Sequence, residues 1–352
     1  MFTKLLLENF TVFQELTLDF APGINVFVGA NGTGKTHLLK LLYCLRESGM
    51  PHRPPLQEKL GAVFRPANND FRRLVRHRSG RTTTHVHAEW GEKSMDVSWH
   101  GGSPSLVVDT SSPLAAEPPV YIPVKEVLSF APGFISLYDK YEMAFEEVYC
   151  DILKLAYLPV RKGRQVEENQ DLLEVIARLI GGRVVMEGDR FFVNHRDARL
   201  EMHLVAEGFR KLALLWQLIH NGTLLAGVTL FWDEPEANLN PFLMREVVKI
   251  LVMLANRGIQ VFLATHNYAL LKELDLSKEA TPITFFALDE AGEQGVTAKP
   301  CGNYAEISPN KIAEEYLLYR GDDRVFPGPA RQGSWFDPSV QGGGHPGRCE
   351  LK

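Results

Sequence analysis

The pattern Gly-x-x-x-x-Gly-Lys-Thr at residues 29–36 constrains this chain more than any other stretch. An apolar run at 24–28 leads into it as a buried strand, and residues 38–42 lead out of it at helical spacing. Strand, glycine turn and helix is the context in which this pattern binds a nucleoside triphosphate. Glycines let successive backbone N–H groups approach phosphate oxygens, and the helix adds its positive N-terminal end. The sequence therefore predicts an ATP phosphate loop formed by Gly29, Ala30, Asn31, Gly32, Thr33, Gly34, Lys35 and Thr36.

Two acids that could complete such a site end the hydrophobic stretch 228–232. At the carboxyl end of a parallel strand, Asp233 would face the phosphate loop and hold Mg²⁺ together with the Thr36 hydroxyl. Glu234 would then orient and polarise the attacking water, while Lys35 reaches the β- and γ-phosphates. The pair alone also fits a solvated turn.

The segments after these acids extend the pattern. Asn240 and Pro241 are typical of a helix cap and a first helical position. The apolar run 261–264 then ends in Thr-His-Asn, where His266 could hydrogen-bond the γ-phosphate; a surface or capping histidine is the alternative.

Alternation along the chain predicts an α/β fold. Strands at 227–232, 260–264 and 283–288 alternate with helices beginning at 241 and 267, which favours a mostly parallel sheet with helices on both faces. We expect an antiparallel β patch at about 62–123 and a helical lobe at about 133–181, both within one head at 1–321. The Gly- and Pro-rich tail 322–352 is expected to be disordered.

Composition is ordinary for a soluble globular protein, with 45% hydrophobic and 23% charged residues among 352. The net charge of −5 argues against a wholly basic nucleic-acid binder. Four separated cysteines favour reduced thiols, the start lacks a signal peptide, and the longest apolar stretch is far short of a membrane span. We therefore expect a cytoplasmic protein.

The motifs Asp-Glu-Pro-Glu-Ala-Asn-Leu-Asn-Pro (233–241) and Ala-Thr-His-Asn (264–267) carry a family resemblance. They resemble the Walker B, D-loop and switch-histidine series of ABC-type ATPases, in the soluble group related to RecF, SMC and the OLD nucleases, often labelled AAA-type in defence systems. The opening segment with its phosphate loop is similar to the start of the same group, and the resemblance spans about 1–320. It implies a P-loop NTPase head of ABC type that dimerises around two ATP molecules.

In that group a signature helix from the partner head completes each ATP site. The matching position here is 206–211, so the resemblance implies nucleotide contacts from Gly208 and Arg210 across the dimer. The residue that replaces the family's Q-loop glutamine is left open between Lys125 and Glu126. The helical insertion is too short for SMC-type arms. No nuclease carboxylates follow residue 280, so we expect no nuclease activity in this chain alone.

Basic residues gather in the first part of the expected β patch. They could grip nucleic-acid phosphates, or they could form a solvated face or pair with an acidic neighbour. These residues are Arg65, Arg72, Arg73, Arg76, Arg78 and Arg81, with His77 among them.

Three functions remain open at this point. The first is an ATPase whose dimer drives or gates a partner or nucleic-acid process, of the DNA-repair or phage-defence type. The second is a scaffold in which bound ATP latches an effector with little turnover. The third is a transporter ATPase subunit, against which the departure from Leu-Ser-Gly-Gly-Gln at 206–211 counts.

Overall fold

The computed structural model describes residues 1–76, 82–100, 105–110, 117–141, 143–161, 169–195, 198–292 and 295–308. All of them belong to one compact unit, Met1–Ile312. The tail 322–352, for which disorder is expected, lies outside the described residues. None of the helices in the described ranges is both long and apolar enough to cross a membrane.

The main sheet has six strands in the order β14-β13-β3-β12-β11-β7. Five of them run parallel, and β14 lies antiparallel to β13 at one edge. Every residue of β3, β11 and β12 is buried, which explains their continuous apolar runs. The strands are β3 (Ile24–Val28), β7 (Val120–Ile122), β11 (Thr229–Asp233), β12 (Gln260–Thr265), β13 (Ile283–Glu290) and β14 (Val296–Cys301).

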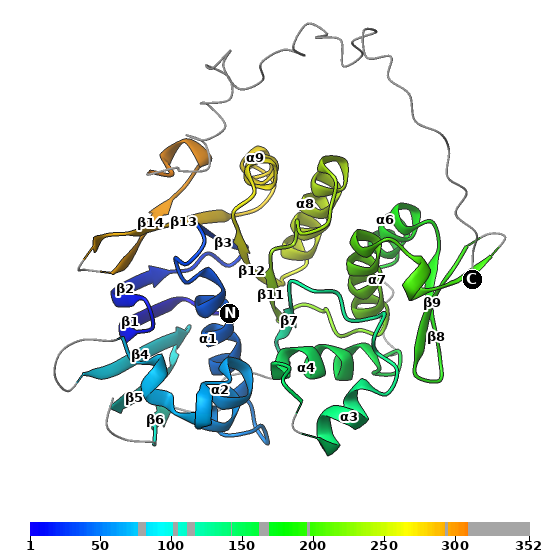
Figure 1. Ribbon diagram of the computed structural model, residues 1–352. Helices are drawn as coiled ribbons and strands as arrows, with labels where there is room; N and C mark the ends of the chain where they lie inside the picture. The colour runs from blue at the N-terminus through cyan, green and yellow to red at the C-terminus, as the bar shows by residue number, and fades with distance from the viewer. Residues whose placement is uncertain are drawn as a thin grey trace, which may run out of the picture. The chain divides into compact units, whose positions relative to one another are not determined.

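Helices cover both faces of this sheet. Helix α1 (Lys35–Ser48) packs on one face, whereas α8 (Pro241–Asn256) and α9 (Tyr268–Leu276) lie on the other (Figure 1). Helix α8 begins as expected, because the Asn240 side chain accepts a hydrogen bond from the Leu243 N–H and proline follows at the first helical position. The predicted α/β P-loop architecture with a mostly parallel sheet is confirmed.

A second sheet is antiparallel, in the order β2-β1-β4-β5-β6. Side chains from this sheet, from α1 and from the main sheet share one hydrophobic cluster, in which the Phe2 ring meets Phe231 and Phe262 edge-on. Helix α1 is therefore held from two sides. The strands are β1 (Lys4–Phe10), β2 (Phe13–Asp19), β4 (Thr83–Trp90), β5 (Lys93–His100) and β6 (Val107–Thr110).

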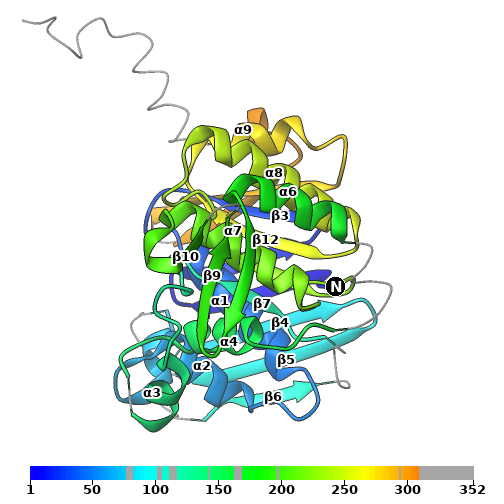
Figure 2. The ribbon, with the colours of Figure 1, turned by 90° about the vertical axis from the view of Figure 1, so that its right-hand side faces the viewer.

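The helical lobe forms the third part of the head (Figure 2). A small sheet of order β10-β9-β8 lies beside its helices, and Glu187-Gly188-Asp189 form the hairpin turn between β8 and β9. The elements are α3 (Phe134–Lys140), α4 (Glu147–Ala156), α6 (Gln170–Ile180), β8 (Arg183–Glu187), β9 (Arg190–Asn194), β10 (Arg199–Glu201), η3 (Met202–Leu204) and α7 (Glu207–His220).

The expected β patch at 62–123 is wrong at both ends. Helix α2 (Leu56–Phe64) and the short turns η1 (Ala67–Asn69) and η2 (Phe71–Leu74) occupy its first part, and the antiparallel strands begin at β4. Leu56, Leu60 and Val63 are buried at helical spacing, so α2 continues into the first residues of the expected patch. At the other end, β7 pairs parallel with β11 and belongs to the main sheet.

Strand register decides which residues meet at the edge of the main sheet. Asp233 at the end of β11 is the neighbour of Ala264 in β12, and Thr265 is the neighbour of Val28 in β3. The carboxyl ends of three adjacent parallel strands thus reach the same edge, where the phosphate loop begins.

Candidate nucleotide site

The phosphate loop connects β3 to α1. Gly32 and Gly34 have φ angles of 86° and 83°, which favour glycine. A Cβ on Gly34 would lie 2.7 Å from side-chain atoms of Val12 and Phe13, so no larger residue fits there. The sequence therefore needs its glycines both to turn the chain and to let the start of α1 approach the β1–β2 turn.

Lys35 is buried at the centre of this loop. Its Nζ donates hydrogen bonds to the carbonyl oxygens of Gly29, at 2.8 Å, and Ala30, at 2.9 Å. Burial lowers the pKa of Lys35, whereas the nearby Glu234 and Asp233 raise it. An anion in the loop would compensate the same buried charge, so this side chain fits a phosphate ligand.

Asp233 and Thr36 are in direct contact. The Thr36 hydroxyl donates to Asp233 Oδ1 at 3.2 Å, and the Tyr121 hydroxyl donates to Oδ2 at 3.3 Å. Burial raises the pKa of Asp233 to about 6; the Thr36 hydrogen bond opposes this shift and Glu234 adds to it. A buried carboxylate beside a threonine hydroxyl is an oxygen donor set that suits Mg²⁺.

Glu234 and His266 lie together at the ends of neighbouring strands. Their side chains approach to 3.3 Å between Glu234 Oε1 and His266 Nδ1. Glu234 has a φ of 45°, an uncommon value for a residue with a side chain, and its N–H donates to the Ala264 carbonyl at 3.0 Å. The strained turn directly follows β11 and places the second acid at the sheet edge.

The signature-like residues lie in a separate cluster at the start of α7. A Cβ on Gly208 would meet the Asn238 carbonyl and the Leu239 side chain, so the helix packs closely on the D-loop segment. Arg210 donates from Nε to the Val205 carbonyl at 2.7 Å and from Nη1 to Glu126 Oε1 at 2.6 Å. Arg210 is thus bound within its own chain.

A family model for an AAA domain, with the description "putative AbiEii toxin, Type IV TA system", matches residues 47–272, more than half of the chain. The chain belongs to this AAA-domain family. A second AAA-domain model matches residues 4–52, which include the phosphate loop.

Curated RecF proteins are similar to a short part of this AAA-domain chain. The DNA replication and repair protein RecF of Cytophaga hutchinsonii is 55% identical over 42 residues, which are 12% of this chain and 11% of that protein. RecF of Heliobacterium modesticaldum is 49% identical over 47 residues, 13% of this chain and 12% of that protein. The chain thus matches only about a tenth of the length of these curated relatives.

Solved structures extend the likeness to the whole head. An Smc head bound to the C-winged helix domain of ScpA superposes with a TM-score of 0.58 at 11% identity, covering 86% of this chain and 98% of that one. For the Pyrococcus furiosus Smc head bound to the C-terminal domain of ScpA, the TM-score is 0.54 at 11% identity, with 91% and 99% covered. At such low identity the likeness shows a shared fold.

Three residues of this AAA-domain head join the site although the sequence did not single them out. Tyr121 contacts Asp233, and the buried Lys211 donates to the Glu234 carbonyl at 3.3 Å. The buried Glu236 accepts from the Thr265 hydroxyl at 2.5 Å and from the His266 N–H at 3.4 Å, and burial raises its pKa. The third acid of Asp-Glu-Pro-Glu was the signal available for Glu236, whereas Tyr121 and Lys211 meet the site through tertiary packing.

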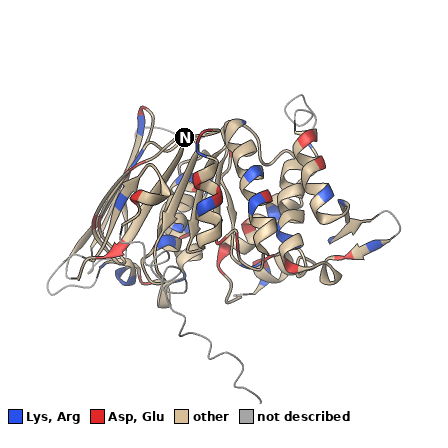
Figure 3. Cartoon of the chain, turned by 90° about the horizontal axis from the view of Figure 1, so that it is seen from above, with Lys and Arg blue, Asp and Glu red and all other residues tan. Residues whose placement is uncertain are grey.

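The arginine cluster is not one open patch in the described residues. Arg65 donates to the Phe145 carbonyl at 3.0 Å, Arg72 pairs with Asp70 at 2.7 Å, and Arg76 donates to the Val12 carbonyl at 2.5 Å. Arg73 is exposed. Lysines and arginines are interspersed with acids over the drawn elements (Figure 3). The remaining members, His77, Arg78 and Arg81, lie outside the described residues.

Proposed function

We propose that this chain binds ATP with Mg²⁺ and hydrolyses it as one head of a head-to-head dimer. The observation that carries the proposal is the contact between Thr36 and Asp233 at 3.2 Å, because it joins the phosphate loop to the Walker B strand. Two segments about 200 residues apart in sequence thereby form one site, as a P-loop ATPase requires.

Each side chain of the site takes a role that its surroundings support. The backbone of 29–34 and Lys35 would hold the phosphates, and Thr36 with Asp233 would hold Mg²⁺. When bound, Mg²⁺ neutralises charge on the β- and γ-phosphate oxygens. Glu234 would accept a proton from the attacking water, and His266, 3.3 Å from it, would hydrogen-bond the γ-phosphate.

The dimer is the part of the proposal that rests on the resemblance. In this reading the N-terminus of α7 faces the partner's ATP, with Gly208 leaving the backbone open to an anion. Arg210 contributes by orienting that helix end, because Glu126 and the Val205 carbonyl already hold its guanidinium. Glu126, buried in the loop after β7, is the better candidate for the Q-loop position, and Lys125 is exposed.

The biological process is also proposed from similarity to known proteins. The matched family is described by a putative toxin of a toxin–antitoxin system, and the matched sequences are DNA replication and repair proteins. We therefore expect the dimer to drive or gate an effector protein or a nucleic-acid step, of the defence or DNA-repair type.

The substitution Glu234→Gln tests the catalytic assignment. It keeps the shape of the side chain but removes the base, so the hydrolysis rate should fall about 10²–10⁴-fold while ATP still binds and the closed dimer accumulates. Phosphate release, ATP affinity and mass by light scattering measure the three effects. Glu279→Gln, an exposed acid in the turn before β13, is the matched control and should behave as the parent. An unchanged rate in Glu234→Gln would refute the assignment.

Single-turnover measurements separate the enzyme from an ATP-latched scaffold. A parent protein that binds ATP and dimerises, yet releases no more phosphate than its Glu234→Gln variant, would support the scaffold. Turnover that depends on Glu234 supports the enzyme.

A further inference from the structure

A buried lysine on helix α7 has no role in the chemistry described so far. Lys211 is 1% exposed and lies three residues after Gly208. Its Nζ donates to the Glu234 carbonyl at 3.3 Å, and among the described residues no carboxylate comes within ion-pair distance of it. Burying an ammonium group without a close counter-ion costs free energy, whereas a methionine would fill a similar volume without that cost. Packing alone therefore does not explain this lysine.

The carbonyl that Lys211 contacts belongs to a strained turn. Glu234 has a φ of 45°, and such a conformation persists in a residue with a side chain only where its surroundings hold it. The Glu234 N–H donates to the Ala264 carbonyl at 3.0 Å, and the Glu234 carbonyl accepts from the Ala237 N–H at 3.0 Å as well as from Lys211. Lys211 is the side chain among these partners, and it connects the turn to α7.

Acidic side chains surround Lys211 without forming an ion pair with it in the described part of the chain. Burial lowers the pKa of Lys211, and Glu236 is first among the acids that raise it again. Glu236 also fixes the end of β12, because it accepts from the Thr265 hydroxyl at 2.5 Å and from the His266 N–H at 3.4 Å. The ammonium group thus acts directly on the backbone that carries Glu234, and through Glu236 on the backbone that carries His266.

The start of α7 packs on the segment that follows this turn. Asn238 donates from Nδ2 to Glu207 Oε1 at 2.8 Å, and a Cβ on Gly208 would lie 2.8 Å from the Asn238 carbonyl oxygen. Helix α7 and residues 234–239 are therefore in contact at the helix end as well as through Lys211. A displacement of α7 would move the backbone of the proposed catalytic acid with it.

We propose that Lys211 is a positioning residue, whose ammonium group holds the Glu234 backbone so that the Glu234 carboxylate stays in place beside His266. Lys211 thereby makes the position of the acid depend on the position of α7. This inference rests on the proposed ATP hydrolysis and adds to it a residue that acts on turnover through Glu234.

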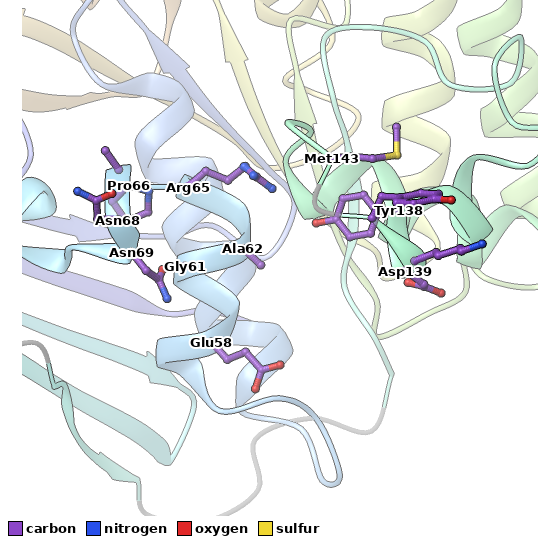
Figure 4. A pocket seen from close by; sticks show the side chains of 13 residues that line it. Glu58, Gly61, Ala62, Arg65, Pro66, Asn68, Asn69, Tyr138, Asp139 and Met143 are labelled. Carbon is purple, nitrogen blue, oxygen red and sulfur yellow. The ribbon is translucent and has the colours of Figure 1, made fainter.

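The substitution Lys211→Met tests the inference, because it keeps the length of the side chain and removes the donor. We expect kcat to fall about 10–100-fold through misplacement of Glu234. Equilibrium ATP affinity should stay within about twofold, since Lys211 does not bind the nucleotide. Lys140→Met is the matched control: Lys140 is exposed and lines a groove of about 790 Å³ between α2 and α3 that none of the nucleotide-site residues line (Figure 4). It should behave as the parent.

Two further measurements distinguish positioning from a general structural role. In the Glu234→Gln background, Lys211→Met should change the single-turnover rate by less than about twofold, because its effect passes through the missing carboxylate. Hydrogen exchange followed by mass spectrometry should show faster exchange of the ATP-free Lys211→Met protein in peptides covering 233–240 and unchanged exchange in α8. Lys140→Met should exchange as the parent in both segments.

Failure of this inference can be told from failure of the proposed function. A parent protein whose hydrolysis does not depend on Glu234 overturns the proposed function and this inference with it. If hydrolysis depends on Glu234 but Lys211→Met retains the parental kcat, the inference alone is overturned. It is also overturned if Lys211→Met lowers the rate equally in the Glu234→Gln background, loses ATP affinity in step with kcat, or leaves exchange at 233–240 unchanged.

Discussion

The nucleotide site and the lobe junction use charged side chains in opposite ways. We define the lobe junction as Lys40, Tyr43 and Lys59 with their partners Glu146, Glu147 and Asp151, which connect α1 and α2 to α4. At the junction each buried charge meets an opposite charge from the chain itself. At the nucleotide site, Asp233 is buried beside neutral hydroxyl donors and its pKa is raised to about 6.

This difference separates structural charge from charge kept for a ligand. Burying a charge costs free energy unless a partner compensates it. At the junction an acid contacts each lysine directly. At the phosphate loop the Lys35 ammonium donates to carbonyl oxygens that a phosphate can replace, and the nearby Glu234 and Asp233 favour its charged form. Substitutions in the two regions should therefore change different observables, stability in the first and ligand binding in the second.

The largest effect on stability is expected for Lys59→Met. Lys59 is 2% exposed; burial alone would lower its pKa, but Asp151 and Glu147 outweigh burial and hold the pKa above its usual value. Removing this buried cation leaves the partly buried carboxylates of Glu147 and Asp151 without their partner, so the free energy of unfolding should fall by about 3 kcal/mol. Denaturant unfolding of the ATP-free protein measures the loss.

Lys154→Met is the matched control for that substitution. Its side chain is 50% exposed and reaches Asp139 at only 3.4 Å, so the expected loss is at most about 1 kcal/mol. Equal losses in the two variants would contradict this interpretation, because burial would then not determine how much each ion pair contributes to the free energy of unfolding.

An intermediate loss of stability is expected for Arg210→Met, because this residue has both a structural contact and a proposed role at the partner's nucleotide. The substitution leaves the buried Glu126 without its cation at 2.6 Å, although the Ser129 hydroxyl and N–H still donate to it. We expect a loss of about 2–3 kcal/mol in the free energy of unfolding without ATP. The double variant with Glu126→Gln should recover part of it. Unchanged stability together with lost ATP-dependent dimerisation would instead show that Arg210 serves only the partner's nucleotide.

The nucleotide site could be predicted from sequence because its parts are local. Glycines at 32 and 34, a lysine and a threonine in consecutive positions, and acids at a strand end are each visible in a short window. Parallel pairing of β3, β12 and β11 then places those windows together, since carboxyl ends of neighbouring strands share one edge. Lys35, Thr36, Asp233, Glu234 and His266 accordingly lie at one edge of the sheet, and their catalytic and ligand-binding roles stay predictions.

The lobe junction could not be predicted in this way. Lys59 and Asp151 are 92 residues apart, and nothing in either segment specifies the other. Helix α2, which supplies Lys59, begins at Leu56, before the expected β patch, and reaches into the first residues of that patch. Pairings between helices depend on tertiary packing, which a single sequence does not display.

The smallest effect is expected at His220, which tests burial without a compensating anion. Burial lowers the pKa of this half-buried imidazole, Arg183 lowers it further, and its ring stacks on Trp216. The unfolded chain therefore binds the proton more readily than the native head, so stability is full above the ordinary histidine pKa and is lost as pH falls through the lowered native value. His220→Gln should make unfolding less sensitive to pH between 7.5 and 5, by a small amount because part of the ring remains in solvent. Urea unfolding of both proteins at these two pH values measures the difference. If the variant lost more stability on acidification than the parent, the native head would stabilise the charged form of His220. That is what the lobe junction does for Lys59.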